Sequence, residues 1–118
     1  PINNYGLSKL GGECAVQMYK NSLILRICMT EKPFLHKKAF TDLKSNFMYH
    51  EKLANILLYL INKKGILNVG GKIQSIYNFA KKNNSKINKS SARKMYGNKY
   101  PLNQSMNVNK FTKIIKEK

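Results

Sequence analysis

Apolar positions along the chain alternate between helical spacing and short continuous runs. Mixed helical spacing predicts a helix over residues 4–20, and the apolar run at residues 23–28 predicts a parallel strand buried on both faces. Residues 50–64 predict a second helix, whose leucines and isoleucines cover most of its circumference and so indicate burial on more than one side. Residues 65–71 then predict a strand that ends in a glycine turn. This alternation predicts an α/β fold.

The remaining segments show weaker patterns. Residues 33–49 have no clean period and predict a loop with short elements. Ser75 is a suitable N-cap for a helix over residues 76–82. Residues 83–99 are rich in Asn, Ser and Lys and predict a mobile loop. Asn107 is expected to cap a last short helix, with its apolar side formed by Phe111, Ile114 and Ile115.

The chain of 118 residues suits one modest domain, and its formal net charge is +17. So basic a chain could bind nucleic acid, but only Arg26 and Arg93 are arginines, and base and phosphate recognition favour arginine over lysine. No specific nucleic-acid partner is therefore expected. Non-specific association with polyanions at low salt still follows from the charge, so a non-enzymatic basic module that binds polyanions stays an alternative.

Cysteines and histidines offer no metal site in the sequence. Cys14 and Cys28 form no C-x-x-C pair and are predicted to be small buried hydrophobic residues. His36 and His50 are isolated, which favours structural roles. No apolar run reaches eighteen residues, so no membrane span is expected, and a cytoplasmic location is the default expectation.

Tyr5 and Lys9 are four residues apart, so a helix places both side chains on one face. An ammonium held beside a phenol favours the phenolate form. Such a tyrosine can exchange a proton with a substrate oxygen near neutral pH. By itself the spacing is far more typical of an ordinary surface pair, so the flanking residues decide the interpretation.

The flanking residues form the pattern P-x-N-x-Y-G-x-S-K-L-x-G-E. It resembles the catalytic segment of the extended short-chain dehydrogenase/reductases, in particular the sugar-nucleotide branch with the dTDP-4-dehydrorhamnose reductases and the NAD-dependent epimerases and dehydratases. Similar segments of that family also match residues 23–28, 65–71 and 101–111. The matched positions of the first segment are Pro1, Asn3, Tyr5, Gly6, Ser8, Lys9, Leu10, Gly12 and Glu13.

This resemblance implies a reduction of a keto-sugar with NADP or NAD as cofactor. Tyr5 would exchange the proton at the sugar oxygen, while Lys9 would bind the nicotinamide ribose and favour the phenolate. Cys28 and Met29, in the loop after the strand, would complete the cofactor site. Many epimerases carry an asparagine where this chain has Met29, so an epimerase or dehydratase is the alternative enzyme.

The resemblance also implies a division of the chain. Residues 1–30 would complete a Rossmann-type nucleotide-binding domain, and residues 31–118 would form most of a small α/β substrate-binding domain, with helix 50–64 packing back on the first. None of the seven glycines gives the G-x-G-x-x-G spacing that holds a pyrophosphate.

The sequence therefore predicts that the chain is the C-terminal portion of a longer enzyme and that this portion is inactive alone. Its expected partners are the missing N-terminal nucleotide-binding half and a nucleotide-activated sugar, and a homodimer through the first helix is an open alternative. A split gene or an inactive remnant are further alternatives.

Overall fold

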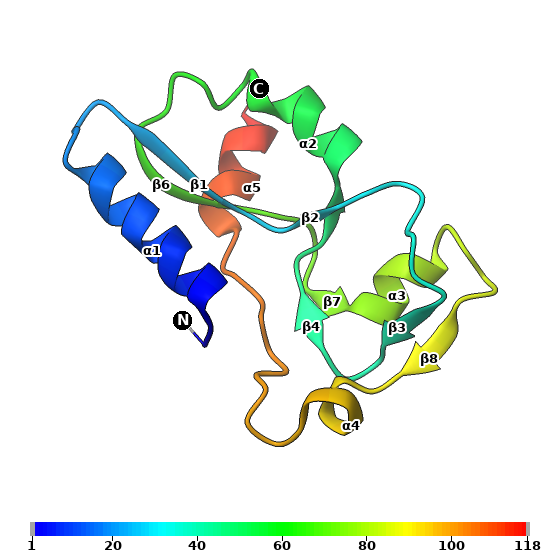
Figure 1. Cartoon of the computed structure of the whole chain (residues 1–118). Helices are drawn as coiled ribbons and strands as arrows, with labels where there is room; N and C mark the ends of the chain where they lie inside the picture. Colours follow the sequence, from blue (N-terminus) through cyan, green and yellow to red (C-terminus); the bar gives the residue numbers. More distant parts are fainter. Residues whose placement is uncertain (1, 118) are drawn as a thin grey trace.

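The computed structural model describes residues 2–117, which form a mixed fold of short helices and strands (Figure 1). Pro1, the first residue of the motif, lies outside the described residues. In chain order the elements are α1 (Asn4–Gln17), β1 (Leu23–Ile27), β2 (Met29–Thr30), β3 (Lys38–Phe40), β4 (Lys44–Ser45), β5 (Met48–Tyr49), α2 (His50–Leu57), β6 (Gly65–Val69), β7 (Gln74–Ser75), α3 (Ile76–Lys81), β8 (Asn88–Ser90), α4 (Ala92–Tyr96) and α5 (Asn109–Lys116).

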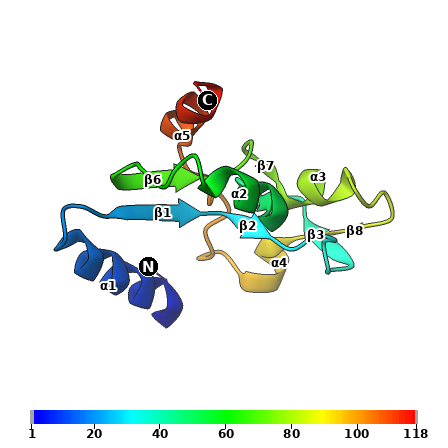
Figure 2. The ribbon, with the colours of Figure 1, turned by 90° about the horizontal axis from the view of Figure 1, so that it is seen from above.

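The first lobe is built on a parallel pair of strands, β1 and β6, in which Leu23 lies opposite Gly65 and Ile27 opposite Val69. Figure 2 shows α1 and α5 on opposite sides of this pair. The core on the α5 side joins buried residues of α2, β5, β6 and α5 with the half-buried Leu23 and Leu25 of β1. Its buried members are Met48, Leu53, Ile56, Leu60, Leu67, Val69 and Phe111.

The second lobe joins β3 and β8 in a parallel pair covered by α3. Its small core consists of Ala39, Ala80 and Ile87, with Phe34 and Ile76 packed against them. Two further strand pairs connect the lobes: β2 runs parallel to β5, and β4 runs antiparallel to β7. The α/β class and the predicted elements at β1, β6, α3 and α5 are confirmed.

Two predictions about burial are wrong. The second helix ends at Leu57 instead of residue 64, and it buries one face only, since Leu53 and Ile56 are its buried residues and Leu57 is 39% exposed. Strand β1 is half-buried at its start and exposed at Arg26 and Ile27, so it is not covered on both faces. Both errors have one physical reason: apolar composition shows that a side chain can be buried and does not show whether a neighbour covers it.

The prediction of a mobile loop over residues 83–99 is also wrong, because β8 and α4 lie there. Cys14, expected in the core, is exposed on α1, whereas Cys28 is half-buried. The residue at the N-cap of the last helix is Val108 and not Asn107 as predicted, although the side-chain oxygen of Asn107 accepts the amide of Asn109 at 2.9 Å. In the part of the chain that the structure describes, no helix combines the length and apolar character that crossing a membrane requires.

Candidate functional site

The first turn of α1 brings Tyr5 and Lys9 together. Asn3 caps this helix, since its side-chain oxygen accepts the amide of Gly6 at 2.8 Å. The hydroxyl of Ser8 donates to the carbonyl of Tyr5 at 2.7 Å. The Nζ atom of Lys9 lies 5.5 Å from the centre of the Tyr5 ring, as the spacing of four residues predicts. Tyr5 is 71% exposed, so its hydroxyl is accessible to a ligand from outside the chain.

One ion pair attaches this helix to the sheet. The carboxylate of Glu13 accepts two hydrogen bonds from the guanidinium of Arg26 on β1, each at 2.8 Å. The hydrogen bond from Arg26 is the main reason that the pKa of Glu13 is lowered, and the positive charge of Arg26 acts in the same direction. Helix α1 contains no buried residue. Its orientation on the sheet therefore depends strongly on this bidentate pair.

Cys28 and Met29 follow β1 directly, as expected, and Cys28 makes internal contacts while Met29 is 53% exposed. The amide of Cys28 donates to the carbonyl of Val69, and the carbonyl of Cys28 accepts the amide of Met48. The thiol of Cys28 lies 3.0 Å from the hydroxyl of Ser45. Within residues 2–117, no hydrogen bond or ion pair joins either residue to Tyr5 or Lys9. Their contact with a cofactor remains a prediction.

The glycine pair after β6 makes a close internal contact. A Cβ atom at Gly70 would lie 2.7 Å from the Cβ and the carbonyl oxygen of Asn46, and one at Gly71 would lie 2.6 Å from the carbonyl oxygen of Phe47. Asn46 is fully buried, and its side chain donates to the carbonyl of Gly71 and accepts the amide of Met106. These glycines therefore let two segments approach closely, and they do not form a phosphate cradle.

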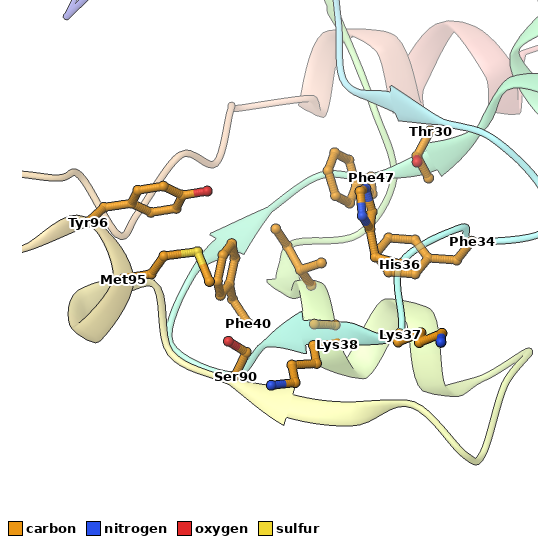
Figure 3. Close-up of a pocket in the computed structure, with 12 residues that line it drawn as sticks. Thr30, Phe34, His36, Lys37, Lys38, Phe40, Phe47, Ser90, Met95 and Tyr96 are labelled. Carbon is orange, nitrogen blue, oxygen red and sulfur yellow. The ribbon is translucent and has the colours of Figure 1, made fainter.

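Sequence reasoning missed a cavity of about 510 Å³ in the second lobe (Figure 3). Its lining is mainly apolar and aromatic, and Lys37 and Lys38, both exposed, add positive charge. The residues come from β2, β3, α3, β8, α4 and the loops between them. For this reason no spacing of residues in the sequence predicts the site. The aromatic residues and Met95, which define the cavity, are Phe34, His36, Phe40, Phe47, Tyr96 and Met95.

The cavity and the Tyr5–Lys9 pair are separate features of the chain. No residue of α1 lines the cavity. Figure 2 shows α1 and α4 on the same side of the β1–β6 pair, opposite α5. The N-terminal end of α1 is the end nearer to β2, whose Thr30 lines the cavity (Figures 1 and 2).

Tyr5 and Lys9 carry groups that could bind a ribose, and the described residues offer no cluster of metal ligands. Tyr5 and Lys9 are exposed, and their hydroxyl and ammonium groups suit the hydroxyls of a ribose. A pyrophosphate needs a glycine-rich turn with free amides, and the glycine pair at residues 70 and 71 is occupied by its packing against Asn46 and Phe47. Among residues 2–117, no group of three or more His, Cys, Asp or Glu side chains could hold a metal ion.

These features define a mixed α/β chain with an exposed tyrosine–lysine pair and an aromatic cavity. The chain is similar to a solved structure, a hypothetical dTDP-4-dehydrorhamnose reductase from Sulfolobus tokodaii, with a TM-score of 0.75 and 28% sequence identity. The match covers 97% of this chain and 49% of the other, so the chain spans about half the length of that reductase. No protein family profile and no curated protein matches the sequence.

Proposed function

We propose that this chain is the part of a nicotinamide-dependent sugar-nucleotide reductase that carries the catalytic tyrosine and the substrate cavity. The structural likeness to a reductase over 97% of the chain carries this proposal. The Tyr5–Lys9 pair on the capped first turn of α1 supports it independently. A reductase is favoured over an epimerase, because the matched structure is named a reductase and Met29 stands where many epimerases carry asparagine.

Tyr5 would give its hydroxyl proton to the oxygen of the keto group that is reduced. When bound, NADPH or NADH supplies the hydride that the carbonyl carbon receives, so that the ketone becomes an alcohol. Lys9 would hold the ribose of the cofactor and stabilise the negative charge left on the oxygen of Tyr5. Its Nζ atom is already placed beside the ring of Tyr5.

The aromatic cavity would receive the nucleotide part of the substrate. Planar bases stack on aromatic side chains, and Phe34, Phe40 and Tyr96 offer three such rings. Lys37 and Lys38 would attract the diphosphate. The sugar would then extend from the cavity toward α1. This arrangement assigns the substrate to the second lobe and the proton transfer to the first.

The rest of the reductase would supply the pyrophosphate site and cover α1. Leu7, Leu10 and Val16 on this helix are 59%, 44% and 43% exposed. The matched reductase is about twice as long as this chain, so a preceding segment or a separate polypeptide of similar length is the expected partner. A second copy of this chain would be the alternative cover.

The test is an assay of the complete protein that contains these residues. We expect it to oxidise NADPH or NADH when a nucleotide-linked keto-sugar such as dTDP-4-dehydrorhamnose is added. Conversion of the sugar without net oxidation of the cofactor would indicate the epimerase alternative. No conversion of any nucleotide-linked sugar would contradict the proposal.

The non-enzymatic alternative has its own test, which is the salt dependence of polyanion binding. A dedicated nucleic-acid module would bind with a defined site size and a steep loss of affinity with salt. Weak, length-independent binding that disappears at moderate salt would leave only the electrostatic background of the +17 charge.

A further inference from the structure

The first amides of helix α4 donate hydrogen bonds to a carboxylate that is distant in the sequence. Helices this short are not stable by themselves, and the first amides of any helix lack partners inside it. Asp42 accepts the amide of Ala92 at 2.8 Å and that of Arg93 at 3.1 Å, and Ser91 accepts the amide of Lys94 at 3.2 Å. Each of the first three amides of α4 therefore has a side-chain acceptor, and two of the three depend on Asp42.

Asp42 is also tied to the residue before the helix. The hydroxyl of Ser91 donates to its carboxylate at 2.8 Å. The pKa of Asp42 is lowered, mainly by the hydrogen bond from the amide of Ala92, so the charged form that accepts these bonds is favoured. Next to it, the amide of Thr41 donates to the carbonyl of Ser90 at 3.0 Å. The segment after β3 thus holds the start of α4 at three positions.

Apart from the ring contacts of Tyr96, little else fixes α4. Ala92 is its only buried residue, and burial of a methyl group contributes little to its position. Yet α4 carries Met95 and Tyr96, which form one wall of the aromatic cavity (Figure 3). The ring of Tyr96 makes an edge contact with Phe40, with centroids 5.8 Å apart, and stacks on Tyr100 at 4.5 Å.

We propose that Asp42 is a positioning residue, which holds α4 so that Met95 and Tyr96 close this wall of the cavity. The placement of the wall is a property of the ligand-free chain. The consequence for affinity rests on the proposed function, in which the cavity takes the nucleotide part of a sugar nucleotide. In this role Asp42 contacts neither substrate nor cofactor and acts only through α4.

The first measurement needs no ligand. The chain has five methionines, whose methyl groups can be labelled and observed by NMR. In Asp42→Ala we expect the Met95 methyl signal to move toward its position in an unstructured peptide, and the exchange of the amides of residues 92–97 to accelerate about tenfold. The signals of Met48 and Met106 should stay in place. If the Met95 methyl signal and the amide exchange rates of residues 92–97 are unchanged in Asp42→Ala, the inference is wrong.

Asp42→Asn is the conservative variant, and it decides the question if Asp42→Ala does not fold. Its amide keeps the shape and one oxygen acceptor but loses the second acceptor and the charge. We expect it to restore part of the protection of α4. Phe111→Leu is the control, because it weakens the core of the first lobe without touching α4. It should lower the melting temperature and leave the Met95 signal in place.

The second measurement is a titration with thymidine diphosphate. We expect its Kd to rise about tenfold in Asp42→Ala, less in Asp42→Asn, and not in Phe111→Leu. Equal affinity in all variants would overturn the effect of Asp42 on the ligand. If thymidine diphosphate does not bind the unmodified chain while Met95 still moves in Asp42→Ala, the substrate assigned to the cavity is wrong and the positioning of α4 by Asp42 stands.

Discussion

At the scale of single residues, the proposed proton transfer depends on one hydroxyl group. Tyr5→Phe keeps the ring next to Lys9 and removes only the transferable proton. General acid catalysis contributes roughly 10²–10⁴-fold, so kcat of the complete reductase should fall by about that factor. Cofactor affinity should change little. Steady-state kinetics with a nucleotide-linked keto-sugar measure both quantities.

Two companion variants separate catalysis from other effects. Tyr19→Phe removes a phenol hydroxyl from a tyrosine that is 65% exposed beyond the end of α1, and it should leave kcat unchanged. Lys9→Met should weaken cofactor binding as well as turnover, because it removes the ligand of the ribose. Near-full activity of Tyr5→Phe would mean that the motif has a structural role instead.

Two glycines of the chain should respond oppositely to alanine. Gly70→Ala places a Cβ atom 2.7 Å from Asn46, so overpacking should destabilise the chain by about 1–3 kcal/mol. Gly11→Ala meets no atom within 4 Å and lies inside α1, so it should stabilise that helix by about 0.5–1 kcal/mol. Urea unfolding measures the first effect, and helix content by circular dichroism measures the second.

The result for Gly11 also reports on the partner of α1. If the remaining half of the reductase packs closely on this helix, alanine should be harmless in the isolated chain and harmful in the complete protein. Equal effects in both would indicate that Gly11 faces solvent in the complete protein too.

At the scale of elements, α1 should depend on Glu13 for its place on the sheet. Glu13→Gln removes the charge that binds the guanidinium of Arg26 twice. Amide exchange in residues 5–17 should accelerate, while exchange in β6 should not, because β6 belongs to the buried core. Glu31→Gln, a matched change in an exposed loop, should affect neither segment. Simultaneous acceleration in α1 and β6 would contradict this independence.

Acid should reproduce the effect of Glu13→Gln. The pKa of Glu13 is lowered in the folded chain, chiefly by the hydrogen bond from Arg26. A carboxyl group of this kind stabilises the folded state above its unfolded pKa, which is about 4.3 for glutamate. That contribution disappears as the pH falls through the lowered pKa. The contribution of the Glu13–Arg26 pair to the attachment of α1 should therefore be complete at neutral pH and lost in the acid range below pH ~4.

The sequence predicts those elements whose local pattern agrees with their packing. Ser75 caps α3 as expected, and the apolar runs at β1 and β6 do form a parallel pair. The segment at residues 83–99 could not be predicted, because β8 is ordered by pairing with β3 and the first amides of α4 by Asp42, each about fifty residues away. The sequence predicts too long a helix at α2, because Leu58 and Ile61 are apolar and yet exposed to solvent.

The candidate site also has one part that the sequence predicts, the Tyr5–Lys9 pair, and one part that it does not predict, the cavity. Tyr5 and Lys9 are local to one helix, so their spacing suffices to place them together. The cavity collects side chains between Thr30 and Tyr96 from several elements. Its aromatic members are visible in the sequence as single residues without a period, and only the pairing of β3 with β8 assembles them.

At the scale of the whole molecule, the chain should not bind the cofactor tightly by itself. In the proposed site Tyr5 and Lys9 would reach only the nicotinamide end, and the described glycine pair is used for internal packing. Calorimetry of the 118-residue chain with NADPH should show no binding in the micromolar range. Because a chain of charge +17 attracts any polyphosphate, the control is adenosine diphosphate ribose at the same salt concentration. Micromolar affinity specific to NADPH would contradict the division of the site between two halves.

The exposure of α1 has a consequence for anyone who handles the chain. Proteases cut segments that open locally before they cut a buried core. Helix α1 has no buried residue, and it is followed by the exposed Lys20, after which trypsin cleaves. Digestion at Lys20 would therefore release the N-terminal peptide and leave residues 21–118, which include every buried residue of both core clusters. Such a product can remain folded and soluble in a purification, and yet it lacks Tyr5 and Lys9.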